Sequence, residues 1–296
     1  PVKLRLDRDD DFMATGRRHG FEFDFDVGFD DDGRVLGVEI DLIANAGFSA
    51  DLSPPVMTRA ICHFDNAYWL PEVAIHGYCA KTNTQSNTAF RGFGGPQGAL
   101  IMELILERVA RKLTLDPLQV RRANFYGTQT NNVTPYRQTV TDNVIGALTD
   151  ELVATSAYTA RRAAVAAFNR SSPVLKRGIA LTPVKFGISF TLTWLNQAGA
   201  LVHVYQDGSI HLNHGGTEMG QGLFQKVAQV AAGVFGVGAD RVKITATDTG
   251  KVPNTSATAA FDSIAQLSRQ PWYLGGWLRS VHRYAADAFV IVLLLH

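Results

Sequence analysis

Cysteine is scarce in this chain of 296 residues, which contains only Cys62 and Cys79 and no C-x-x-C pair. Two such thiols cannot by themselves hold an iron–sulfur cluster, which takes four ligands, so any cluster has to lie on another chain or domain. They also provide no disulfide framework, as is typical of a protein in a reducing compartment. We therefore expect a cytoplasmic protein.

An excess of charge of either sign is also missing, because 28 Lys and Arg residues face 27 Asp and Glu residues. The formal net charge of +1 gives no electrostatic reason to expect nucleic acid or an anionic membrane as a partner. The start lacks the basic and then apolar pattern of a secretory signal. It also lacks an initiator Met, and we interpret the chain as a fragment of a longer protein.

The composition, with 46% hydrophobic residues, is adequate for one large or two medium globular domains. Hydrophobic periodicity predicts strands at 21–29, 34–44, 178–183, 186–193, 200–205, 209–212 and 242–248, and helices at 98–112, 117–125, 142–154, 156–169 and 223–234. We expect hairpin turns at 30–33 and at Asp207-Gly208. The order is neither all-β nor a regular βαβ alternation, so the predicted fold class is α+β with mixed sheets and helices.

A glycine-rich loop, TAFRGFGGPQ at 88–97, precedes the longest predicted helix. Gly92, Gly94 and Gly95 allow a backbone to approach a ligand closely, and Arg91 can fork onto a phosphate or oxo group. A loop of this kind at a helix start favours a bound anion. An ordinary tight turn, with Arg91 in a surface ion pair, is the alternative interpretation.

A second glycine-rich turn, HGGTEMGQG at 214–222, precedes a second predicted helix. Two such turns far apart in the sequence predict one large, polar, phosphate-bearing ligand held by both. We interpret Glu218 and His214 as local turn and cap residues. Gln221 is either a contact to that ligand or simply the first residue of the helix.

The amino-acid sequences of these segments resemble those of the molybdenum-cofactor subunit of the xanthine dehydrogenase family. The likeness covers TAFRGFGGPQ, KFGISF at 185–190 and LNQAGALVHVYQDGSIHLNHGGTEMGQGL at 195–223, within residues 1–260. It implies a molybdenum-hydroxylase cofactor-binding domain over 1–260 with a bound molybdenum–molybdopterin group. The residues that it implies for the cofactor are Arg91, Gly92, Gln221 and Ala260.

The resemblance also implies a purine site. The family holds a flat purine between two phenylalanines, and Arg59 matches an arginine that family members acting on aldehydes generally lack. The implied substrate-binding residues are Arg59, Phe93, Phe190 and Thr191. For each phenylalanine alone, core packing would be the ordinary explanation.

The implied reaction is hydroxylation of xanthine or hypoxanthine at an electron-poor ring carbon, with water as the oxygen source. The family's general-base glutamate lies beyond the matching region, so the catalytic base stays unknown here. The implied partners are iron–sulfur and FAD-binding subunits or domains, in an assembly that we expect to be dimeric. We expect the chain alone to be inactive.

The character of the sequence changes near residue 261, and residues 261–296 resemble the heme-binding helix of membrane cytochromes b. His282 and His296 are fourteen residues apart, which places them on one helix face about 21 Å apart as possible heme ligands. The final apolar run is too short to span a bilayer alone. Two alternatives stay open: a membrane-tethered electron-transfer subunit in which this segment is native, and an inactive fusion product.

Overall fold

The computed structural model describes residues 3–187, 199–218, 220–245 and 251. It divides into two compact units, Pro1–Gly187 and Ile188–His296, which are described separately. The first unit contains three strands and six helices among its described residues: α1 (Arg8–Ala14), β1 (Phe21–Phe29), β2 (Val35–Gly47), α2 (Ser53–Cys62), β3 (Val73–Lys81), α3 (Gly95–Leu113), α4 (Pro117–Ala123), α5 (Ile145–Thr155) and α6 (Tyr158–Ser171).

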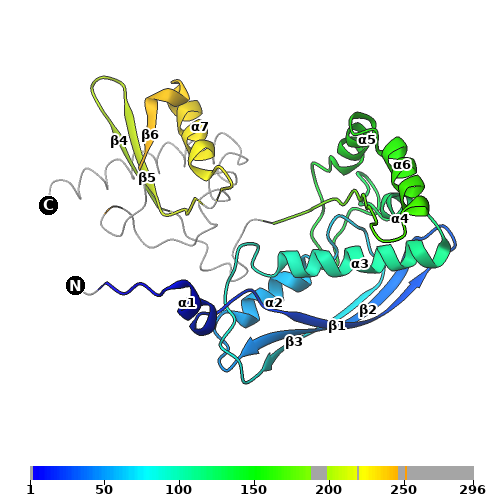
Figure 1. The fold of residues 1–296 in the computed structure, drawn as a ribbon. Coiled ribbons are helices and arrows are strands. Elements are labelled where there is room, and N and C mark those ends of the chain that lie inside the picture. Colours follow the sequence, from blue (N-terminus) through cyan, green and yellow to red (C-terminus); the bar gives the residue numbers. More distant parts are fainter. Residues whose placement is uncertain (1–2, 188–198, 219, 246–250, 252–296) are drawn as a thin grey trace. The chain divides into compact units, whose positions relative to one another are not determined.

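The sheet of the first unit has the strand order β1-β2-β3, and α3 lies across it (Figure 1). β1 and β2 form the predicted hairpin, in which Asp30 Oδ1 accepts hydrogen bonds from the backbone N–H groups of Asp32 and Arg34 at the turn. β2 then pairs in parallel with β3, and α2 is the crossover between them. The predicted hairpin is confirmed, whereas α2 and β3 were not predicted.

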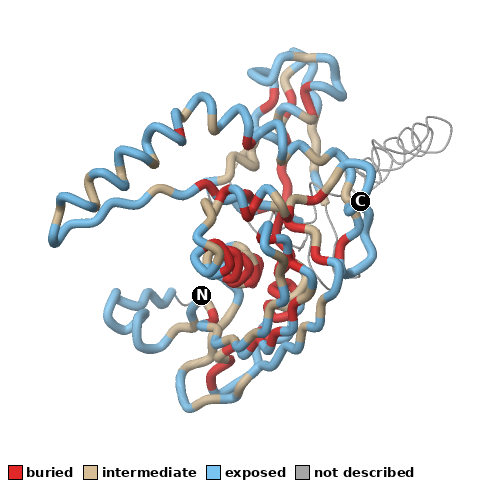
Figure 2. The backbone as a smooth tube through the Cα atoms, turned by 90° about the vertical axis from the view of Figure 1, so that its right-hand side faces the viewer, coloured by how far each residue is buried: buried red, intermediate tan, exposed pale blue. Residues whose placement is uncertain are grey.

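The core of the first unit lies between α3 and the inner face of the sheet. The alternation in β1 turns its phenylalanines inward, and the buried residues of β2 and α3 pack against them. Figure 2 colours the backbone by the burial of each residue. The buried members include Ile40, Leu42, Phe64, Met102, Ile105 and Leu106. An α-helix with apolar residues at this spacing buries one face against a sheet, so α3 is fixed in place by its own sequence.

The outer face of the same sheet is acidic. Its exposed positions include Glu22, Asp24 and Asp26 of β1, and the register sets Asp24 directly opposite Asp41 and Asp26 opposite Glu39. His76 of β3 lies beside Asp41, with its Nδ1 3.0 Å from a carboxylate oxygen. Like charges directly opposite each other in a sheet are destabilising, so the inner face has to offset their repulsion.

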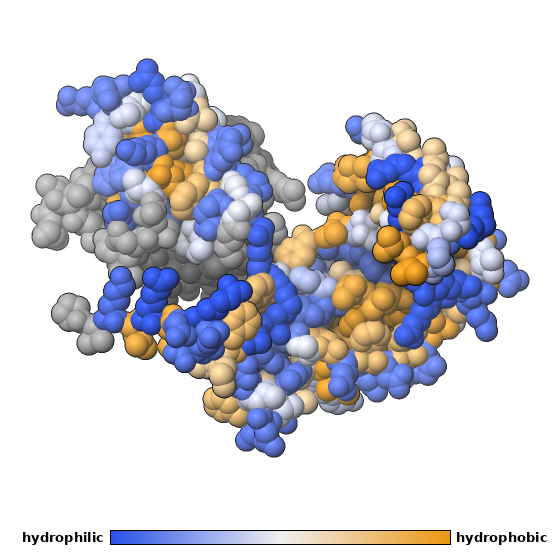
Figure 3. All heavy atoms as spheres, in the orientation of Figure 1, coloured by the Kyte–Doolittle hydropathy of each residue, from blue (hydrophilic) through white to orange (hydrophobic). Residues whose placement is uncertain are grey.

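The helices α4, α5 and α6 follow the predicted positions, each within a few residues of the predicted bounds. In Figure 3, apolar side chains gather along α3 near these helices, where Leu100 and Leu104 are exposed. The strand predicted at 178–183 is wrong, because this stretch has no ladder partner in the structure. The part of the next predicted strand after Gly187 lies outside the described residues.

The second unit contains a small sheet in the order β4-β5-β6: β4 (Ala200–Val204), β5 (Ile210–His214) and β6 (Val242–Ile244), together with α7 (Leu223–Phe235) and the 3-10 turn η2 (Ala239–Arg241). β4 and β5 form the hairpin predicted around Asp207-Gly208, and β6 joins β5 in parallel. Ile210, Leu212 and Val227 belong to its core. Mixed sheets with helices confirm the α+β class.

Candidate functional site

The first glycine loop is shaped by its contacts with α2. Gly94 has φ +100°, and a Cβ there would lie 2.0 Å from the backbone oxygen of Val56. Gly92 has φ +94°, and its Cβ would meet the ring of Pro96 at 2.4 Å. Only glycine tolerates both the dihedral and the space. The close approach that we expected a ligand to make is therefore made at Gly92 and Gly94 by the protein itself.

Arg91 of this loop is contacted through its backbone by a second arginine, Arg18. The side chain of Arg91 is exposed, and its carbonyl oxygen accepts a hydrogen bond of 2.5 Å from Nη2 of Arg18. The guanidinium of Arg18 lies 4.5 Å from the ring centroid of Phe90, and burial lowers its pKa. Arg18 thus fixes the backbone from which Arg91 projects. No motif in the sequence singled out Arg18.

Two of the predicted substrate residues come together at the end of α2. Arg59, 4% exposed, has its guanidinium carbon 6.0 Å from the ring centroid of Phe93 and 5.5 Å from that of Phe186. Phe93 holds φ +51°, an uncommon value for a bulky residue that points to a constrained position. A Cβ on Gly95 would lie 2.3 Å from the Phe186 ring, so this glycine makes room for the aromatic group.

Phe186 was not predicted as a site residue, because within KFGISF only Phe190 was assigned a role at the substrate. It belongs to residues 183–187, here called the strap, which crosses the end of α2. Asn66 accepts a hydrogen bond from the backbone N–H of Lys185 and donates one to the carbonyl of Pro183, both at 3.0 Å. Lys185 also forms an ion pair with Asp65, which is 2% exposed. Burial raises the pKa of Asp65 although the Lys185 ammonium opposes that effect.

His63 completes the contacts between α2 and the strap. Its Nε2 lies 3.0 Å from the backbone nitrogen of Gly187, and Arg59 Nη1 donates a 2.5 Å hydrogen bond to the carbonyl of the same glycine. The ring of His63 also packs against Phe186, with 4.7 Å between centroids. This role was not predicted, because no motif in the sequence distinguishes His63 from an ordinary histidine.

The second glycine turn is closed by its own glutamate. Glu218 accepts hydrogen bonds from the backbone N–H groups of Gly220, Gly222 and Phe224 at 2.8–3.2 Å, and these bonds lower its pKa. His214 Nδ1 accepts one from the N–H of Gly216 at 3.1 Å. The local roles expected for Glu218 and His214 are confirmed. Glu218 thus accepts from the N–H groups of the N-cap Gly222 and of Phe224 at the N-terminus of α7.

Gln221 points its amide back into the same turn, where Nε2 donates a 2.8 Å hydrogen bond to the carbonyl of Thr217. The remaining predicted site residues lie outside the described residues, namely Phe190, Thr191, Ala260, His282 and His296. Within the described residues, no group of three His, Cys, Asp or Glu side chains is placed to hold a metal ion. The same residues include no helix with the length and apolar character to cross a membrane.

Two family models of the same description, molybdopterin cofactor-binding domain, match residues 1–125 and 151–265. Xanthine dehydrogenase from Dictyostelium discoideum is 49% identical over 260 residues, and xanthine dehydrogenase/oxidase from Gallus gallus is 48% identical over 260 residues. Each match covers 88% of this chain but only 19% of the relative. The chain thus spans about a fifth of the length of these relatives. The likeness of 261–296 to cytochrome b finds no support in these matches.

Solved structures show the same fold at lower identity. Quinoline 2-oxidoreductase from Pseudomonas putida 86 has a TM-score of 0.69 at 23% identity, over 88% of this chain and 36% of that chain. Aldehyde oxidoreductase from Desulfovibrio gigas has a TM-score of 0.67 at 21% identity, over 87% of this chain and 28% of that chain. From the two cofactor-binding models and the close sequence relatives together, the chain belongs to the xanthine dehydrogenase family of molybdopterin cofactor-binding proteins.

Proposed function

We propose that this chain supplies cofactor-facing and substrate-facing segments of a molybdenum hydroxylase that acts on xanthine or hypoxanthine. In this reaction a ring C–H becomes C–OH, with oxygen from water, and two electrons and two protons leave. The observation that carries the proposal is the placement of buried Arg59 beside Phe93. The identity of nearly half to xanthine dehydrogenases supports the same substrate class.

The residues of the two glycine turns fit a polar, phosphate-bearing group in their chemistry. Arg91 offers an exposed cation on a backbone that Arg18 fixes, and Gln221 has its side-chain amide at the start of α7, where Nε2 already donates one hydrogen bond to the carbonyl of Thr217. Guanidinium and amide donors suit phosphate and pterin oxygens. A molybdopterin group, when bound, would supply the centre that accepts the two electrons. Arg91, Gly92 and Gln221, together with Ala260, are the residues that we propose would hold it.

We propose that Arg59 stabilises the negative charge that develops on the purine during the reaction. A guanidinium stays protonated at any ordinary pH, and here it is buried between the rings of Phe93 and Phe186. When an oxygen nucleophile adds to a purine carbon, negative charge spreads over the ring and its exocyclic oxygen. A fixed cation at that oxygen stabilises the transition state more than the ground state, which raises the rate.

Phe93 is proposed to orient the flat purine, because aromatic rings favour offset or edge-on contact. We propose that Phe190 and Thr191 complete the substrate site. Phe190 follows Phe186 by four residues in the sequence. The electrons would leave through iron–sulfur and FAD-binding domains or subunits, since two cysteines cannot hold a cluster here.

The test uses a protein that contains this chain together with the remaining length found in its relatives. Arg59→Met should lower turnover of xanthine by about 10²–10³-fold, as for other single contacts to a developing charge, but should lower turnover of a flat aromatic aldehyde far less. Arg108→Met is the matched control, because Arg108 is an exposed α3 residue stacked on Phe25. Equal losses for both substrates in Arg59→Met would show that Arg59 does not select purines.

A further inference from the structure

Both backbone polar groups of Gly187 are held from one turn of α2. The N–H of Gly187 faces Nε2 of His63 at 3.0 Å, and its carbonyl accepts from Nη1 of Arg59 at 2.5 Å. Arg59 and His63 are four residues apart, so their side chains lie on the same face of a helix. Two side chains at the C-terminal end of α2 therefore hold the backbone of Gly187 by both of its polar groups.

The hydrogen bond at the second ring nitrogen of His63, Nδ1, shows which of the two nitrogens carries the proton. Nδ1 lies 3.0 Å from the carbonyl oxygen of Arg59. A carbonyl only accepts and a backbone N–H only donates, so Nδ1 must carry the proton and Nε2 must present its lone pair. In the opposite tautomer, or in the imidazolium, an N–H on Nε2 would point at the N–H of Gly187.

The surroundings of His63 keep it in this neutral form. The pKa of His63 is lowered to about 4, chiefly because burial removes the imidazole from water. The hydrogen bond to the Arg59 carbonyl opposes this lowering, and the charges of Arg59 and Lys185 add to it. Asp65, two residues after His63, forms an ion pair with Lys185. The thiol of Cys62 is kept protonated, since burial raises its pKa.

We propose that His63 is a positioning residue: as the neutral Nδ1–H tautomer it clamps, together with Arg59, both backbone polar groups of Gly187. The clamp fixes the backbone of Gly187 and orients the guanidinium of Arg59. The proposal rests on the proposed function only in treating Arg59 as substrate-facing. The clamp itself is tested without any cofactor.

The first test is the tautomer of His63 in the whole chain labelled with ¹⁵N-histidine. Nitrogen–proton correlation spectra distinguish a protonated Nδ1 from a protonated Nε2, and the His63 signals are those that disappear in His63→Gln and in His63→Asn. We expect one fixed Nδ1–H form at pH 7 that persists to pH 5. An Nε2–H form, or an imidazolium at pH 6, would overturn the clamp.

The second test separates the two hydrogen bonds. The amide of Gln reaches the place of Nε2 and can accept from Gly187, whereas the amide of Asn reaches the place of Nδ1 and can serve only the carbonyl of Arg59. Exchange of the Gly187 amide hydrogen, followed by mass spectrometry on peptides that cover this residue, should be on the order of tenfold faster in His63→Asn, as for the loss of one hydrogen bond. In His63→Gln it should stay near the wild-type rate.

Equal exchange in the two variants would mean that His63 only fills space, and would refute the positioning role. In the longer protein, His63→Asn should raise the KM for xanthine several-fold more than His63→Gln does. A protein that shows the expected tautomer and exchange but turns over no xanthine would refute the proposed function and leave the clamp established.

Discussion

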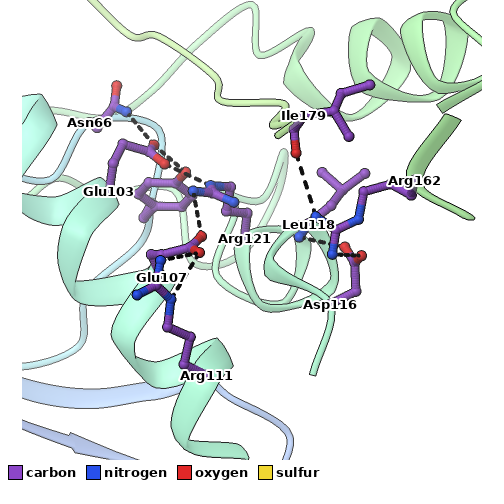
Figure 4. A network of polar contacts seen from close by, with 10 residues as sticks. Asn66, Glu103, Glu107, Arg111, Asp116, Leu118, Arg121, Arg162 and Ile179 are labelled. Atoms are coloured by element: carbon purple, nitrogen blue, oxygen red, sulfur yellow. Dashed lines mark hydrogen bonds and ion pairs between the residues drawn. The ribbon is translucent and has the colours of Figure 1, made fainter. Parts of the chain in front are cut away.

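Replacing Glu103 by Gln should destabilise the first unit strongly, because three donors converge on this carboxylate (Figure 4). Arg121 Nε donates to Oε2 at 2.7 Å, while Tyr68 Oη and Asn66 Nδ2 donate to Oε1 at 2.5 and 3.0 Å. A Gln side chain has the same shape but one oxygen and one NH₂ group. At least one of the three donors would then face another donor.

The expected cost follows from burial. The side chains of Arg121 and Glu103 are 4% and 13% exposed, and Tyr68 is fully buried. Removing one member of a buried ion pair costs about 3–5 kcal/mol, because the remaining charge is left without compensation. For a domain whose total stability is about 5–15 kcal/mol, this loss is a large fraction. The network also includes Asn66, so the strap should loosen with it.

Glu107→Gln is the matched control. Glu107 lies 3.7 Å from Arg121 Nη2, pairs also with Arg111, and its side chain is 30% exposed. Removing such an outer contact should cost no more than about 1 kcal/mol. Urea unfolding followed by far-UV circular dichroism gives the midpoints and the slopes. If Glu103→Gln shifts the midpoint no further than Glu107→Gln at equal slope, the convergence of donors on Glu103 carries no special stability.

Four further outcomes are expected. Gly94→Ala should leave the chain insoluble or grossly destabilised, because the new Cβ would meet the α2 backbone. Gly146→Ala in α5 is the control: it has open space around it and should raise the thermal midpoint by the equivalent of about 0.5–1 kcal/mol. His63 has a pKa of about 4 in the folded chain, below the ordinary histidine value of 6.5. Its neutral form therefore stabilises the fold above pH 6.5, and that contribution is lost as the pH falls from 6.5 towards 4. The urea midpoint should fall further over this range in wild type than in His63→Gln. Glu218→Ala should speed amide exchange at the start of α7, and unchanged exchange would contradict its capping role. The chain alone should contain little molybdenum and form no urate from xanthine, so stoichiometric metal with urate formation would contradict the expectation of inactivity.

The sequence predicted those elements whose periodicity is undisturbed. The alternating phenylalanines of β1 and the apolar stripe of α3 each bury one face, so pattern and structure agree. β3 was missed because His76, Gly77 and Tyr78 lie on an exposed edge strand without clean alternation. α2 was missed because Pro54 and Pro55 look like a break, although proline is well tolerated in the first turn of a helix.

Only those site residues that lie in a motif shared with the family could be predicted from the sequence. Arg59 and Phe93 were identified by resemblance, and the structure places them side by side. His63 and Phe186 contribute through the path of the strap, which is a tertiary feature that no local pattern encodes. The strand predicted at 178–183 failed for a similar reason, since the carbonyls of Ile179 and Pro183 accept hydrogen bonds from the side chains of Arg162 and Asn66.

The acidic outer face of β1 has a consequence for how copies of this chain meet. Among the described strands β1 lies at the edge of its sheet, and it has an apolar residue at every second position, a pattern that in isolation would pair readily with another such strand. Glu22, Asp24 and Asp26 alternate with these apolar residues, so a second β1 laid alongside would bring two rows of carboxylates together. The like charges that face each other within the sheet would therefore also repel a second copy of this strand.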